Sequence, residues 1–139
     1  MKDYLFIDNF RGFTDTCFPV TDVNFLVGEN STGKTSVLGL IKLFTGPRFL
    51  MEQRADFADE HVSFGHFADM VSAHSAERKQ FHIGLVRERP KRKDEEQRVG
   101  GWLCTFREDK GRPRLSNYTF SEGSKKISLR YNRDQIRYK

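Results

Sequence analysis

Apolar and polar positions follow two different patterns along the chain, and the change falls near residue 81. Before it, the short apolar runs Tyr4–Ile7 and Val23–Val27 predict buried strands, and the largely apolar stretch Ser36–Phe44 predicts a buried helix. After it, residues 81–131 alternate with period two and are interrupted by short polar turns. That second pattern is typical of an antiparallel meander of strands.

The intervening segment, residues 48–80, is less regular. Arg48–Ala58 favours a helix, because Phe49, Leu50, Gln53 and Phe57 recur near the helical period. Phe64–Val71 fits either a short helix or a turn. Arg89–Gln97 has the composition of a charged loop. The strands predicted for the second half are Phe81–Val86, Trp102–Arg107, Leu115–Phe120, Lys126–Tyr131 and a last one over Gln135–Lys139.

The stretch Gly28–Thr35 reads Gly-Glu-Asn-Ser-Thr-Gly-Lys-Thr and matches the pattern G-x-x-x-x-G-K-S/T. This is the phosphate-binding loop that joins a strand to a helix in nucleoside-triphosphate-binding proteins. Its position between the apolar run Val23–Val27 and the predicted helix is the context that the motif requires. The sequence therefore predicts an α/β fold with a strand–loop–helix core, followed by the antiparallel meander.

Each residue type in this loop has a physical role. Gly28 and Gly33 allow backbone conformations that a Cβ would obstruct, so that the amides of Ser31, Thr32 and their neighbours can form a nest for phosphate oxygens. Lys34 is the predicted catalytic residue, since its ammonium reaches the β- and γ-phosphates. Thr35 supplies a hydroxyl to Mg²⁺, and Ser36 is placed to meet the α-phosphate. The expected cofactors are ATP and Mg²⁺.

The residues before the loop carry a family resemblance. Phe6–Phe13, which contains Asn9-Phe10-Arg11-Gly12-Phe13, followed by the run Val23–Ser36, resembles the N-terminal lobe of ABC-type ATPase heads of the SMC, RecF and OLD group. In that group an opening strand ends in such an Asn-Phe-basic-x-Phe turn, and the loop has Asn at its third position. The resemblance is specific over residues 5–45 and architectural beyond them.

The resemblance has several implications. Asn30 would lie near the γ-phosphate and Arg11 close to the nucleotide. Two heads would enclose ATP between them, which implies a homodimer or a higher oligomer. Phe64–Val71 also resembles segments of OLD-like and stand-alone prokaryotic ATPases, including those of Septu and retron antiphage systems, and this implies a nuclease partner that the ATPase regulates.

Hydrolysis requires more than this loop. The run Leu5–Asp8 ends in a carboxylate but precedes the loop, so we interpret Asp8 as a strand-end residue and not as a magnesium ligand. Neither a Ser-Gly-Gly signature nor the D-x-x-G and N-K-x-D motifs of GTPases occur. We expect residues 1–139 to be the N-terminal part of a longer ATPase, with a loop core (1–47), an irregular segment (48–80) and an antiparallel β lobe (81–139).

The net charge of +5 is unevenly distributed. Residues 1–86 carry 8 basic and 11 acidic side chains, whereas residues 87–139 carry 16 basic and 8 acidic ones. The basic half is either a solvated charged surface or a contact for DNA or RNA. The second reading gives an alternative function, a non-hydrolysing nucleotide-binding regulatory module with a basic nucleic-acid surface. Cys17 and Cys104 lack a metal-binding spacing, and no apolar run has the length of a membrane span, so we expect a cytoplasmic protein with no membrane partner.

Overall fold

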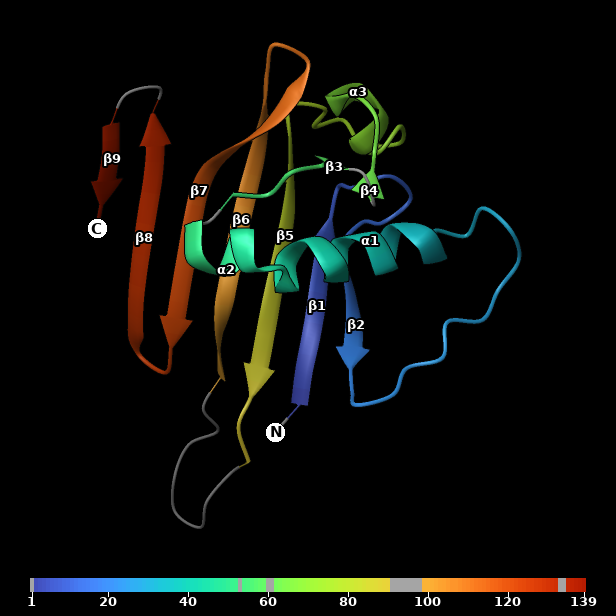
Figure 1. Cartoon of the computed structure of the whole chain (residues 1–139). Coiled ribbons are helices and arrows are strands. Elements are labelled where there is room, and N and C mark those ends of the chain that lie inside the picture. Colours follow the sequence, from blue (N-terminus) through green and yellow to red (C-terminus); the bar gives the residue numbers. More distant parts are fainter. Residues whose placement is uncertain (1, 53, 60–61, 91–98, 133–134) are drawn as a thin grey trace.

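The computed structural model describes residues 2–52, 54–59, 62–90, 99–132 and 135–139. Over this part of the chain, one seven-stranded antiparallel sheet has the helix that follows the loop lying across one of its faces (Figure 1). The strand order is β2-β1-β5-β6-β7-β8-β9, and β3 and β4 form a separate two-stranded pair. The elements are β1 (Lys2–Asp8), β2 (Thr16–Val20), α1 (Lys34–Thr45), α2 (Pro47–Glu52), β3 (Ala58–Asp59), β4 (Val62–Ser63), α3 (Phe67–Met70), β5 (Gln80–Glu88), β6 (Val99–Asp109), β7 (Arg112–Glu122), β8 (Lys125–Asn132) and β9 (Gln135–Tyr138).

The antiparallel meander predicted for the second half is confirmed. Strands β5 to β9 pair in sequence order, each antiparallel to the next. Tight turns join two of these pairs, with Lys110 and Gly111 at one and Gly123, at a φ of 58°, at the other. Most of the charged loop predicted over Arg89–Gln97 lies outside the described residues.

The strand predicted immediately before the loop is wrong. Val23, Phe25 and Val27 are 68%, 86% and 92% exposed, and their backbone forms no strand. The side chain of Asn24 explains where the sheet ends, because its amide donates to the Pro19 carbonyl at 2.7 Å and its oxygen accepts from the Thr21 amide at 2.8 Å. These bonds cap β2 and turn the chain away from the sheet. Strand β2, which the sequence pattern missed, takes the place beside β1.

The helix predicted over Arg48–Ala58 is also wrong in length. Helix α1 ends at Thr45, and α2 begins at Pro47 and ends at Glu52, which leaves Phe57 outside any helix. The Asp56 carboxylate accepts a hydrogen bond from the Ala58 amide at 3.1 Å, a local turn that competes with helix formation. Phe57 is thereby directed into the core, where it is buried. Of the two readings of Phe64–Val71, the short helix is the one observed, as α3.

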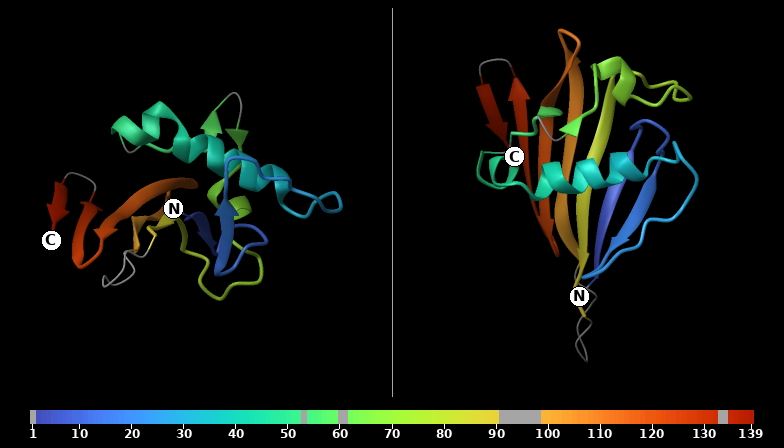
Figure 2. Two further views of the ribbon diagram at one scale, coloured as in Figure 1. Left: turned by 90° about the horizontal axis from the view of Figure 1, so that it is seen from below. Right: turned by 45° about the vertical axis from the view of Figure 1, so that its right-hand side comes forward.

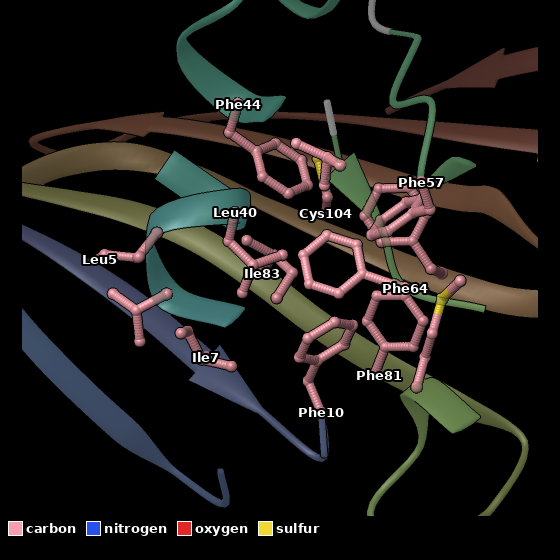
Figure 3. Close-up of a cluster of buried hydrophobic side chains, with 14 of the residues drawn as sticks. Leu5, Ile7, Phe10, Leu40, Phe44, Phe57, Phe64, Phe81, Ile83 and Cys104 are labelled. Atoms are coloured by element: carbon pink, nitrogen blue, oxygen red, sulfur yellow. The ribbon is translucent and has the colours of Figure 1, made fainter. Parts of the chain in front are cut away.

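The hydrophobic core lies between α1 and the sheet (Figure 3). Val37, Leu40 and Phe44 recur on one side of α1 and are all buried. They pack against the apolar side chains of β1, β5 and β6. Phe81 lies at the centre of an aromatic group, with its ring centroid 5.1–5.7 Å from those of its four neighbours; these neighbours are Phe10, Phe57, Phe67 and Phe106. Each such buried side chain contributes about 1.5–3 kcal/mol through its removal from water.

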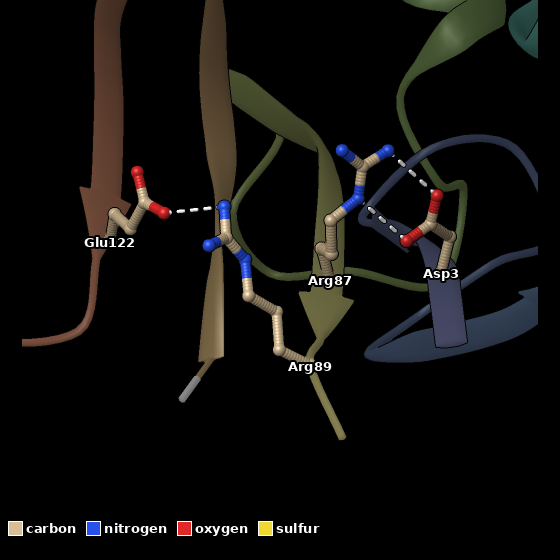
Figure 4. Close-up of polar contacts among 4 residues, drawn as sticks. All are labelled: Asp3, Arg87, Arg89 and Glu122. Carbon is tan, nitrogen blue, oxygen red and sulfur yellow. Dashed lines mark hydrogen bonds and ion pairs between the residues drawn. The ribbon is translucent and has the colours of Figure 1, made fainter. Parts of the chain in front are cut away.

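An ion pair fixes the register of β1 against β5. Asp3 is directly opposite Arg87, and the guanidinium donates two hydrogen bonds to the carboxylate, at 2.8 and 2.9 Å (Figure 4). The bond from Arg87 is the main reason that the pKa of Asp3 is lowered. Arg89 forms a further ion pair with Glu122, which links the segment after β5 to the end of β7. These two ion pairs lie at the end of the sheet remote from α3. They join β1 to β5 and the segment after β5 to β7.

Candidate nucleotide-binding site

The loop between β2 and α1 projects from one edge of the molecule (Figure 1). Residues 30–33 form a tight turn, and the helix begins directly at Lys34. Ser31 and Gly33 both have positive φ angles, of 69° and 91°. Left-handed residues at short spacing are typical of backbone nests that bind anions. The loop is therefore turned, not extended, at the positions where the sequence predicts phosphate binding.

The first turn of α1 offers free backbone donors. The first helical hydrogen bond runs from the Val37 amide to the Gly33 carbonyl at 3.0 Å, so the amides of Lys34, Thr35 and Ser36 precede the helical ladder. No side chain of the described residues caps this end of the helix. Because the helix dipole places partial positive charge here, an anion at this position would be stabilised.

The Lys34 ammonium folds back over the loop. It donates to the Gly28 carbonyl at 2.7 Å and to the Glu29 carbonyl, and it lies 3.4 Å from the Thr32 hydroxyl. The Thr32 hydroxyl in turn donates to the Glu29 carbonyl at 2.9 Å, which closes the turn. These bonds hold the positive charge within the loop rather than in free solvent.

Arg11 joins the turn after β1 to the start of α1. Its guanidinium donates to the Ser36 hydroxyl at 2.8 Å and to the Phe64 carbonyl at 3.2 Å, and it stacks over the Phe64 ring at 4.9 Å. Its own amide donates to the Met70 carbonyl at 2.6 Å. The side chain is thus fixed by two separate segments of the chain and the backbone by a third. It brings a second cation to the base of the loop.

The Phe13 ring packs against the loop at Gly33. The turn that carries it is closed by two backbone hydrogen bonds between Phe10 and Phe13, at 2.9 and 3.1 Å. A Cβ on Gly33 would lie 2.5 Å from the tip of the Phe13 ring. Glycine is therefore required at position 33 both by its φ of 91° and by this contact. The sequence motif demands glycine here, but the ring that enforces it could not be identified from the sequence.

The structure thus brings together part of the predicted site. Arg11 meets Ser36 on the first turn of α1, and Gly33 lies against Phe13. Lys34 begins the same helix, and its ammonium lies on the loop carbonyls of Gly28 and Glu29. The remaining predicted residues, which are Gly28, Asn30, Ser31, Thr32 and Thr35, lie along the exposed outer side of the loop and on the first turn of the helix. Within the described residues neither Lys34 nor Arg11 forms an ion pair with a carboxylate. Two cations and a helix start without a counter-ion fit a polyphosphate.

Residues 1–130 match the model of a family described as the AAA ATPase domain. Since the match covers most of the chain, this protein belongs to that family. Its class is that of ATP-binding ATPases. No curated protein matches the sequence. Among the described residues, none of the helices is both long and apolar enough to cross a membrane.

Replacing Gly33 by alanine is expected to destabilise the loop and the helix start. The left-handed backbone costs alanine about 1–2 kcal/mol, and displacing the Phe13 ring adds about 1–3 kcal/mol. The free energy of unfolding in urea, followed by circular dichroism, should fall by about 2–5 kcal/mol. Gly12→Ala is the matched control, because a Cβ at Gly12 meets nothing within 4 Å. Equal stability of the two variants would contradict the packing of Phe13 against the loop.

Proposed function

We propose that this chain is the Mg-ATP-binding half of an ABC/SMC-like ATPase head, which pairs with a second head around ATP. The observation that carries this proposal is the turned loop that leads into the uncapped start of α1, where the Lys34 ammonium lies on loop carbonyls and has no paired carboxylate among the described residues. The family match supports ATP as the ligand. The resemblance of residues 5–45 to SMC-like heads supports the finer assignment.

In this proposal each residue of the loop acts on a different part of the ligand. Lys34 exchanges its carbonyl partners for the β- and γ-phosphates, and the amides of the first helical turn bind the same oxygens. The exposed hydroxyl of Thr35 would hold Mg²⁺, which offsets the charge of the phosphates. Asn30 is exposed on the turn and would lie near the terminal phosphate. Arg11 orients Ser36 and adds positive charge behind the loop.

The position of the loop supports pairing with a second head. Glu29, Asn30, Ser31 and Thr32 are all exposed, so the outer side of a bound nucleotide would be open to another molecule. The second head would complete the site with a signature motif of its own. A nuclease of a DNA-repair or antiphage system is the proposed client of this pair, and the resemblance of Phe64–Val71 to OLD-like and antiphage ATPases supports that part.

Sedimentation velocity tests the pairing. With Mg²⁺ and saturating ATP, the chain should sediment as a dimer, whereas without nucleotide it should sediment as a monomer. Lys34→Ala should remain monomeric under both conditions, because it lacks the ammonium that binds the phosphates. A wild-type chain that binds ATP and stays monomeric would contradict pairing through this face.

The alternative function is a nucleotide-binding regulatory module that does not hydrolyse ATP and binds nucleic acid through its basic half. The arginine-lined groove described below favours it. ATP turnover by the full-length protein separates the two functions. Turnover supports the head pair, and tight ATP binding without turnover supports the regulatory module.

A further inference from the structure

The sheet has a polar surface on the face opposite α1. A groove of about 760 Å³ lies over strands β5 to β9. Ile83 is buried on the α1 face, and its neighbour His82 must face the other way because side chains alternate along a strand. In Figure 2 the helices α1 and α2 lie on one side of the sheet only. The groove therefore opens on the face that these helices leave uncovered.

A row of polar side chains crosses five strands in this groove. Residues directly paired across strands share one face of the sheet. His82 is opposite Thr105, Thr105 opposite Asn117, Asn117 opposite Arg130, and Arg130 opposite Arg137. At about 4.8 Å per strand, the row spans about 19 Å. A second, shorter row runs from Gln80 through Arg107 to Arg114.

The arginines of the groove are opposed to one another. Arg107 is directly opposite Arg114, and Arg130 is directly opposite Arg137. Like charges in such pairs destabilise a sheet. Arg114 is partly neutralised by Asp109 at 3.5 Å, and Arg107 donates to Gln80 at 3.0 Å.

The charges of the outer pair, Arg130 and Arg137, are less neutralised by neighbouring groups. In the part of the chain that the structure describes, neither Arg130 nor Arg137 forms an ion pair with a carboxylate. Both side chains are exposed. Burial is the main cause that lowers the pKa of His82, so the net positive charge of the groove at neutral pH comes from its four arginines, which outnumber the lining carboxylates of Glu108 and Asp109. A bound anion between Arg130 and Arg137 would attract both guanidinium groups and so offset their mutual repulsion.

We propose that this groove binds the phosphodiester backbone of a nucleic acid. The planar fork of arginine matches phosphate geometry, and hydroxyl and amide side chains such as those of Ser116 and Asn117 are ordinary partners of phosphate and sugar oxygens. A row of about 19 Å corresponds to about five to six nucleotides at ~3.4 Å of rise each. Contact with the backbone fixes position but does not read sequence.

The lining residues also indicate what the groove does not recognise. Tyr131 is the only Phe, Tyr or Trp among them, so a platform for stacking successive bases is missing from the described lining. Binding is therefore independent of sequence, and duplex and single-stranded forms are both accepted through their phosphates. The groove lies on the opposite face of the sheet from α1. ATP at the loop and nucleic acid at the groove therefore contact different residues.

Fluorescence anisotropy tests the groove. The probes are a labelled 20-base-pair duplex and a labelled 20-nucleotide single strand, and each is measured at 50 and 200 mM salt. Arg130→Ala combined with Arg137→Ala should weaken binding at least about tenfold at low salt. It should also reduce the slope of log affinity against log salt by about 2, one unit per lost phosphate contact. The matched control is Lys42→Ala with Lys125→Ala, which removes the same charge from exposed positions outside the groove lining.

Each outcome decides the proposal. A wild-type chain that binds neither probe at 50 mM salt, or an equal loss in the control variant, would overturn it. Full displacement of the duplex from Lys34→Ala by ATP alone would also overturn it, because the groove would then be a site for free nucleotide. Lys34→Ala should otherwise bind nucleic acid like wild type, and the groove variant should keep its ATP affinity. The groove proposal and the ATP-site proposal can therefore be contradicted separately.

Discussion

Lys34→Ala is expected to abolish ATP binding. The ammonium lies within the loop, on the Gly28 and Glu29 carbonyls, and would form charge-assisted hydrogen bonds to two phosphates. Each such bond contributes about 1.5–3 kcal/mol, so that removal of both costs about 3 kcal/mol or more. That loss corresponds to a fall in affinity of more than ~100-fold. Isothermal titration of the chain with Mg-ATP measures it.

The control for this variant is Lys126→Ala. Lys126 lies on β8 and is exposed, and its removal changes the net charge by the same amount. Its ATP affinity should stay within about twofold of wild type, since an exposed charge remote from the loop contributes little. Equal ATP affinity of wild type and Lys34→Ala would reject the assignment of the loop.

Phe81→Ala is expected to have the largest effect on stability. Phe81 is fully buried, and its ring contacts four other phenylalanines that come from separate parts of the chain. A cavity of this kind costs about 3–5 kcal/mol, a large part of the stability of a domain of this size. Urea unfolding followed by circular dichroism should show a lower midpoint with little change in slope.

Phe25→Ala is the matched control, because it removes the same side chain from an exposed position. Phe25 is 86% exposed in the segment that the sequence pattern assigned to a strand. Its removal should change the free energy of unfolding by no more than about 0.5 kcal/mol. A loss comparable to that of Phe81→Ala would show that residues 23–27 pack as a strand in solution, and would contradict the fold described above.

The contrast between these two phenylalanines shows what the sequence could predict about the fold. The strands within residues 81–131 follow a period-two pattern and are separated by polar turns, so local pattern alone defined the meander. The apolar run Val23–Val27 has an equally good pattern, but a strand also requires a partner with free hydrogen-bonding groups. The Asn24 side chain ends β2 and turns the chain away from the sheet, and this contact depends on geometry that periodicity does not contain.

The candidate site divides in the same way. The identity of Gly33 and Lys34 follows from a local motif, because backbone conformation and one ammonium group define the loop. The supports of the loop are not local: Arg11 reaches Ser36 across 25 positions and Phe64 across 53. The pairing of Arg130 with Arg137 likewise became visible only with the strand register. A charge count revealed the basic half but not the face on which its arginines gather.

In the proposed function, the backbone amides from Ser31 to Thr35, together with Lys34, bind the phosphates of ATP. Two-dimensional ¹⁵N–¹H NMR of the chain during titration with Mg-ATP observes these amides directly. We expect their resonances to shift together and to saturate with the ATP dissociation constant, while amides on β8 remain unchanged. Unshifted resonances for Ser31–Thr35 at saturating ATP would contradict the account, even if ATP bound elsewhere on the molecule.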